Sequence, residues 1–196
     1  MWKECSGKLH RGFARTKRVV ARRPRTYLHW RKPGENMDEI ARIADQLERA
    51  FDGDPWWGPS TRTALAGIDA EAAARRVVAD AHTVWEIVLH MTAWQREVSR
   101  RLREGTAREP ADGDWPQLPE PTQANWTIAL EALERANREA VLAVRDMDLG
   151  RLDELIGEAR DRSVGSGVSL YVTLHGLVQH NVAHTAQISL LAKALR

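Results

Sequence analysis

The sequence LHGLVQHNVAHTAQI, at residues 174–188, is the stretch that decides the fold. Its apolar residues recur every three or four positions, which predicts an amphipathic helix, and the pattern extends over about 168–195. His180 and His184 lie four residues apart in this helix. At about 100° per residue they stand about 40° apart on one face, with one turn between them. Two imidazoles stacked in this way can hold one metal ion.

Three further amphipathic helices are predicted upstream of this stretch. Each combines apolar residues at helical spacing with a polar opposite face. Their predicted ranges are about 38–51, 82–104 and 122–146. Thr122, which follows Pro121, is expected to open the third of them.

The connections between the long helices are predicted to be irregular or shortly helical. Ser60 and Asp69 are expected to cap two short helical pieces after the first helix. A short segment at 149–156 and a flexible connector from Gly157 to Gly167 are expected before the last helix. No strand pattern competes with the helical one.

Four long amphipathic helices in one domain predict an all-α fold, a four-helix bundle over residues 37–196. The link between the first and second helices is about 30 residues long. Such a crossover lets these two helices run parallel, whereas a short loop would make them antiparallel neighbours. We therefore expect a bundle with a long crossover between helices one and two.

Residues 1–36 differ from the rest of the chain in charge. They hold 11 Lys and Arg against Glu4 and Glu35, a net charge of +9, and the remainder carries a net charge of −7. We interpret this segment as a basic extension, either disordered or upstream sequence translated from a mis-assigned start. A functional basic arm that binds nucleic acid is the alternative. The acidic body argues against nucleic acid as the main partner.

Several classes of protein are excluded by what the sequence lacks. It has no run of 18 apolar residues, so no membrane-spanning helix is expected. Cys5 is the single cysteine, which excludes an internal disulfide and fits the reducing cytoplasm. Residues 37–196 have no thiol for catalysis, and neither a phosphate-binding glycine loop nor a nucleophile elbow is present.

His90 in the second predicted helix could join His180 and His184. It lies in the middle of an apolar stripe with Ile87 and Trp94. Three protein ligands and one open position are typical of catalytic metal sites, whereas structural zinc is usually closed by four ligands. A hydrogen-bonded core histidine is the alternative for each of them, and spacing alone leaves both interpretations open. His175 is expected to point elsewhere on its helix.

Two polar residues near these histidines are candidates for supporting roles. Glu86 lies one turn before His90 and could act as a general base, orient a ligand, or simply be a solvated helix residue. Gln187 could orient a water molecule or a ligand histidine, or be a buried amide between helices. His82 at the helix start is expected to be a capping or rim residue, and Trp115 to anchor a loop.

Several motifs resemble the DinB/YfiT-like superfamily of bacterial four-helix bundle metalloproteins, and the resemblance covers about 37–196. The motifs that carry it are MDEIARIADQL at 37–47, WGPS at 57–60, HTVWEIVLHMTAW at 82–94, WP at 115–116 and the ending at 174–188. The resemblance implies that His90, His180 and His184 bind one divalent metal ion, commonly zinc or nickel. Asn181 and Ala183 depart from the family pattern, which often has an acidic and an aromatic residue there.

The resemblance implies two kinds of activity on a small molecule. One is transfer to or from a low-molecular-weight bacterial thiol, and the other is metal-dependent hydrolysis. In both, the metal lowers the pKa of a bound water or thiol and makes a nucleophile at neutral pH. A homodimer is expected, because apolar bundle faces in such proteins often pair. The alternative is a non-catalytic stress or binding protein with a vestigial or structural metal site.

Overall fold

The helices begin at residues whose side chains satisfy the free N–H groups of the first turn. In the computed structural model, which describes residues 37–195, a side-chain oxygen before each α-helix accepts a backbone N–H three residues later. The capping residues are Asp38, Ser60, Asp69, Thr83, Thr122 and Ser169. The predicted capping by Ser60, Asp69 and Thr122 is therefore confirmed.

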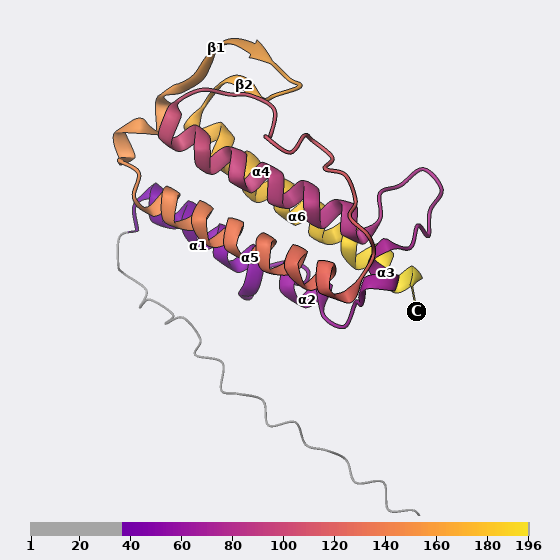
Figure 1. Cartoon of the computed structure of the whole chain (residues 1–196). Coiled ribbons are helices and arrows are strands. Elements are labelled where there is room, and N and C mark those ends of the chain that lie inside the picture. Colours follow the sequence, from indigo (N-terminus) through magenta and orange to yellow (C-terminus); the bar gives the residue numbers. More distant parts are fainter. Residues whose placement is uncertain (1–36, 196) are drawn as a thin grey trace, which may run out of the picture. The chain divides into compact units, whose positions relative to one another are not determined.

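The described chain is mostly helical, with a small two-stranded sheet (Figure 1). Its elements in chain order are α1 (Glu39–Asp52), α2 (Thr61–Leu65), α3 (Ala70–Ala74), α4 (Val84–Glu104), α5 (Gln123–Arg145), the 3₁₀ helix η1 (Leu149–Asp153), β1 (Leu155–Asp161), β2 (Ser166–Ser169) and α6 (Leu170–Ala194). The four long helices lie close to the predicted ranges. The interpretation of residues 1–36 lies outside the described residues.

The long helices pack side by side, with α5 against α1 and α4, and α6 against the same two helices. Helices α1 and α6 run in the same direction. At one end Glu39 pairs with His175, and near the other the Thr61 hydroxyl lies 2.7 Å from that of Thr185. Helix α4 runs opposite to α6 and parallel to α5 (Figure 1). Within residues 37–195 no helix is long and apolar enough to cross a membrane.

The prediction that the first two long helices run parallel is wrong, because α1 and α4 run in opposite directions. The long link between them is present and carries α2 and α3. Both short helices lie at the end of the molecule where α1 stops, so α4 starts from that same end (Figure 1). The connection that travels the length of the helices is 105–122, which leads from the end of α4 to the start of α5.

The segment predicted as a flexible connector is instead an antiparallel β-hairpin of β1 and β2. The prediction missed it because the strands lack apolar alternation: only Ile156 of β1 is buried, and the other β1 side chains are partly or fully exposed. Glycine makes the close pairing possible. A Cβ atom on Gly167, which has a φ of 68°, would lie 2.6 Å from the backbone of Arg160.

The core consists of two apolar clusters with buried amides between them. One cluster holds Leu47, Val98 and Leu174, and the other holds Trp85 and its neighbours. In each of α4, α5 and α6, one buried amide lies between the residues of one cluster and those of the other. These amides are Gln95, Asn137 and Asn181. Both amide atoms of Gln95 and Oδ1 of Asn137 have no hydrogen-bond partner among the described residues.

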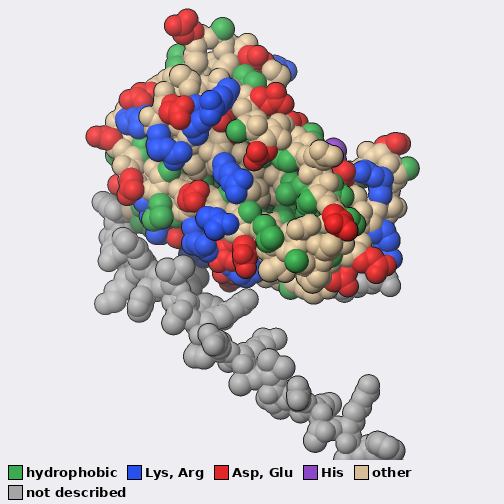
Figure 2. Space-filling model, in the orientation of Figure 1, with side chains coloured by type: hydrophobic (Ala, Val, Ile, Leu, Met, Phe, Trp, Pro, Cys, Tyr) green, Lys and Arg blue, Asp and Glu red, His purple; other side chains and the backbone are tan. Residues whose placement is uncertain are grey.

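Charged side chains of both signs are interspersed over the face shown in Figure 2. Several of them pair across elements, as Arg145 does with Glu48 at 2.8 Å and Arg62 with Glu134 at 3.1 Å. These pairs are partly exposed to solvent, where an ion pair contributes little to stability. The energetically important charges are therefore the buried ones.

Glu97 in α4 is the centre of a buried ionic network. Its carboxylate accepts hydrogen bonds from the guanidinium groups of Arg100, at 2.7 and 2.8 Å, and Arg101, at 2.9 Å. Desolvation alone would raise the pKa of Glu97, but the hydrogen bonds from Arg100 and Arg101 outweigh it and lower the pKa. The same arginines donate to backbone carbonyls of Thr106, Arg108 and Val164. The network thus fixes the start of connection 105–122 and the hairpin turn to α4.

We expect Glu97→Gln to lower the free energy of unfolding by about 3 kcal/mol, because it leaves the buried guanidinium group of Arg101 without a carboxylate and Arg100 with that of Glu104 alone. The pKa of Glu97 is lower in the folded protein than its ordinary value of 4.5. The stabilisation from the Glu97 carboxylate is therefore complete above about pH 4.5, and it is lost as the pH falls through the pKa of the folded state. Urea unfolding measures the change. Glu104→Gln is the matched control, because its half-exposed carboxylate contacts the same Arg100 and should contribute less than about 1 kcal/mol. Equal losses in the two variants would contradict the central role of Glu97.

Candidate metal centre

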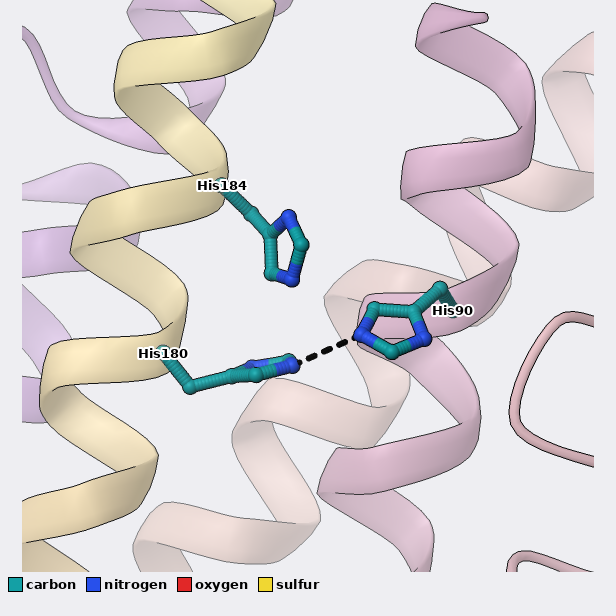
Figure 3. Close-up of side chains that lie close together, drawn as sticks. All are labelled: His90, His180 and His184. Carbon is teal, nitrogen blue, oxygen red and sulfur yellow. Dashed lines mark hydrogen bonds between the residues drawn. The ribbon is translucent and has the colours of Figure 1, made fainter. Parts of the chain in front are cut away.

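Three histidines from two antiparallel helices converge at a partly buried site, where His90 is buried and the other two are half-buried. His90 comes from α4, and His180 and His184 come from successive turns of α6 (Figure 3). Each offers a ring nitrogen, and these atoms all lie within 4.8 Å of one another. The arrangement follows from the packing of α4 against α6, which brings residues 90 positions apart in the sequence into contact. The structure therefore brings the three predicted ligands together.

The ring of His90 is oriented by the connection 105–122. Its Nδ1–H donates to the backbone carbonyl of Asp114 at 2.6 Å, which fixes the tautomer whose Nε2 carries the free lone pair. That Nε2 lies 2.9 Å from Nε2 of His180. The side chain of Asp114 is also engaged, because its Oδ1 accepts the indole N–H of Trp94 at 2.6 Å.

The two histidines of α6 have different supports. Nδ1–H of His184 donates to the amide oxygen of Gln187 at 2.8 Å, so Nε2 of His184 is also left with its lone pair. Gln187 therefore contacts a histidine of the centre. This contact is the one needed for its predicted role of orienting a ligand histidine. Nδ1 of His180 lies 3.5 Å from Oδ1 of Asn181, which is at the limit of a hydrogen bond.

The donor set fits a single divalent ion. Three neutral imidazole nitrogens are suitable ligands for zinc, nickel, copper or iron. Tetrahedral ligation at about 2.0–2.1 Å would separate two nitrogens by about 3.4 Å. The Nε2 atoms of His90 and His180, at 2.9 Å, would have to move apart by about 0.5 Å, which small rotations of the two side chains supply. No carboxylate or thiolate of residues 37–195 joins the three-histidine group.

Burial keeps these imidazoles neutral. Desolvation lowers the pKa of His180 to about 4, and the neighbouring His184 and His90 add to this effect by charge repulsion. Desolvation also lowers the pKa of His90 and of His184, against the opposing hydrogen bonds to Asp114 and Gln187. A neutral imidazole is the form that binds metal. His90 and His184 hold Nε2 lone pairs at neutral pH, whereas His180 donates its Nε2–H to His90 and would bind metal through Nε2 once that proton has moved to Nδ1.

Glu86 has structural contacts at the start of α4. One oxygen of its carboxylate accepts the backbone N–H of Thr83 at 2.6 Å, and the Thr83 side chain accepts the N–H of Glu86, which completes a capping box. Both carboxylate oxygens also accept hydrogen bonds from Arg76, at 2.7 and 3.0 Å. Desolvation tends to raise the pKa of Glu86, but the bonds from Thr83 and Arg76 lower it overall. Its contacts are thus with the helix cap.

The remaining histidines of the described chain lie apart from the three. His175 points away from the centre and its Nε2 lies 3.2 Å from a carboxylate oxygen of Glu39. His82 precedes the cap of α4, and its ring stacks on the indole of Trp115 with centroids 3.4 Å apart. Sequence reasoning missed Asp114, because its ligand-orienting group is a backbone carbonyl that every residue type possesses. The only signal was its place beside Trp115-Pro116.

Acidification is expected to destabilise the metal-free protein. Because the pKa of His180 falls from its ordinary 6.5 to about 4 on folding, the unfolded chain binds more protons between these values. The stabilisation from neutral His180 is complete above about pH 6.5. As the pH falls toward 4, the free energy of unfolding decreases by up to about 3 kcal/mol. Urea unfolding across this pH range measures the slope. His180→Gln should flatten it, and an unchanged slope would contradict the assignment.

The family described as the DinB superfamily matches residues 59–188. No curated protein and no solved structure matches the chain. The matched region contains α4, α5 and all three clustered histidines, and it spans well over half of the sequence. The chain belongs to the DinB superfamily.

Proposed function

We propose that His90, His180 and His184 bind one divalent metal ion, zinc or nickel, and that the protein uses it to act on a small molecule. The proposed reaction is transfer involving a low-molecular-weight thiol, or hydrolysis. The observation that carries the proposal is the convergence of three neutral ring nitrogens within 4.8 Å. We also propose that α1, α4, α5 and α6 form the four-helix bundle expected from the sequence.

The metal, when bound, supplies a Lewis acid that lowers the pKa of a water or thiol ligand. The chain's own residues supply the rest. His90, His180 and His184 bind the ion through Nε2, and Asp114 and Gln187 orient two of the rings by accepting their Nδ1–H groups. Glu86 fixes the first turn of α4 through the capping box, and so the position of His90 one turn further along.

The absence of a fourth protein ligand favours an enzyme over a structural or vestigial site. A structural zinc is usually closed by four protein ligands, whereas a catalytic ion keeps one position for water or substrate. Among residues 37–195 the cluster contains histidines only. Glu86, the residue that could have closed the site, has its carboxylate held by Thr83 and Arg76. A cytoplasmic location is part of the proposal, since reduced thiols are abundant there.

Metal analysis of the purified protein tests the ligand assignment. We expect about one equivalent of a divalent metal in the parent and a loss of at least tenfold in affinity in His90→Ala, His180→Ala and His184→Ala. His175→Ala is the matched control, because it removes a histidine of the same helix that pairs with Glu39 outside the cluster. Equal metal content in the parent and the three ligand variants would end the assignment.

The same variants separate an enzyme from a binding protein. The metal-loaded parent is assayed with low-molecular-weight thiols and electrophiles, and separately with ester and amide substrates. Turnover that disappears in the ligand variants and persists in His175→Ala supports the proposal. Stoichiometric metal without turnover on either class of substrate would favour the non-catalytic alternative.

We propose that the protein forms a homodimer through the outer face of α6. A groove of about 350 Å³ there is lined by Trp57, Val182 and Leu190, among others, and Trp57 and Leu190 are about two-thirds exposed. Exposed apolar surface of this kind is typical of interfaces, and a two-fold pair is the commonest assembly.

The oligomeric state in solution tests this surface. Sedimentation analysis should give a dimer for the parent, and Leu190→Lys should shift it toward monomer by placing a charge in the apolar groove. Leu142→Lys is the control, since Leu142 is a comparably exposed leucine on α5. A monomeric parent, or equal effects of both variants, would overturn the proposed interface.

A further inference from the structure

The indole of Trp115 is stacked between two imidazoles, one of which belongs to the candidate metal centre. Its ring centroid lies 3.4 Å from that of His82 with 6° between the planes, and 4.0 Å from that of His90 with 12°. The edge of Trp115 also faces His184, with centroids 6.1 Å apart at 83°. One side of the three-histidine cluster is therefore covered by a single aromatic side chain from the loop 105–122.

The residue before Trp115 restrains the same imidazole in a different direction. The carbonyl of Asp114 accepts the Nδ1–H of His90 in the ring plane, while Trp115 lies against the ring face. The Asp114 side chain is held in turn by the indole N–H of Trp94. An in-plane hydrogen bond and a stacked face together restrict rotation of the His90 ring, so that Nε2 stays directed at His180.

The loop that carries these two residues is itself anchored. At its start, Arg100 and Arg101 donate to the carbonyls of Thr106 and Arg108 from the buried Glu97 network. Nearer the centre, the N–H of Gly113 donates to the carbonyl of Pro110 at 2.9 Å, and Gly113 has a φ of 82°. This tight turn directs Asp114 and Trp115 back onto α4.

We propose that Trp115, together with the Asp114 carbonyl, is a positioning element that fixes the ring plane and tautomer of His90 for metal binding. The inference rests on the proposed function only for its effect on the metal. The positioning of His90 is a property of the chain itself. His82 contributes by covering the outer face of the indole, which holds Trp115 in the stack.

The experiment compares the parent protein with Trp115→Ala, Trp115→Phe and the control Trp56→Ala, in which a fully exposed tryptophan outside the centre and outside the proposed dimer groove is removed. The first readout uses metal-free protein labelled with ¹⁵N-histidine. The imidazole spectrum reports the tautomer of His90 and the ring-current shift caused by Trp115. The second readout is the dissociation constant for Zn²⁺ and the absorption spectrum of the Co²⁺-loaded protein, which reports ligand geometry.

We expect His90 of the parent to be the Nδ1–H tautomer with a marked ring-current shift. In Trp115→Ala the shift should disappear, the Co²⁺ bands should change, and the dissociation constant should rise about tenfold. Trp115→Phe should restore most of the affinity because it keeps a stacked ring, and Trp56→Ala should match the parent. Thermal unfolding of each variant identifies any general loss of structure.

Two outcomes separate this inference from the proposed function. If the parent binds no metal but the imidazole spectrum still responds to Trp115→Ala, the proposed function fails and the positioning of His90 stands. If Trp115→Ala leaves both the His90 tautomer and the metal affinity unchanged, the positioning role is wrong even though the site binds metal. Equal effects of Trp115→Ala and Trp56→Ala would also overturn it.

Discussion

The structure depends on the antiparallel packing of α4 against α6, which places three imidazoles around one point in a partly dehydrated interior. Neutral histidines are tolerated there because two of the three donate Nδ1–H to oxygen atoms of Asp114 and Gln187. The same burial lowers the pKa of each ring and so preserves the lone pairs that a metal requires. Stability of the apo protein and affinity for a cation are therefore linked: the protonation that would loosen the fold in acid also removes the donors.

The connections contribute as much to the site as the helices. Because α4 and α5 are parallel, the chain must return along the length of the molecule between them, and this return segment passes the cluster. The buried carboxylate of Glu97 fixes one end of the segment, and the turn at Gly113 directs Asp114 and Trp115 onto His90. A bundle with a short loop at this place would offer the same histidines without the groups that orient one of them.

The helical elements and the three histidines could be predicted from the sequence, because apolar spacing and the i, i+4 pair depend only on local helix geometry. The topology could not, since the length of the link before α4 does not reveal that α2 and α3 stay at one end. The hairpin was missed because its strands are mostly exposed and carry no alternating pattern. The roles of Asp114 and Glu86 depend on tertiary contacts: one acts through a backbone carbonyl, and the other is held by Arg76, ten residues away. Family membership agrees with the resemblance seen in the motifs.

The buried amides between the two apolar clusters have a consequence for how the helices can move. If α6 slid by one turn along its neighbours, Asn181 would leave the level between the two apolar clusters and move toward one of them. An amide moved into an apolar layer has no polar neighbour, which costs about 1–3 kcal/mol, so sliding is disfavoured in both directions. The three amides thus fix the axial position of α6 relative to α4. They thereby also fix the distance between His90 and the two histidines of α6.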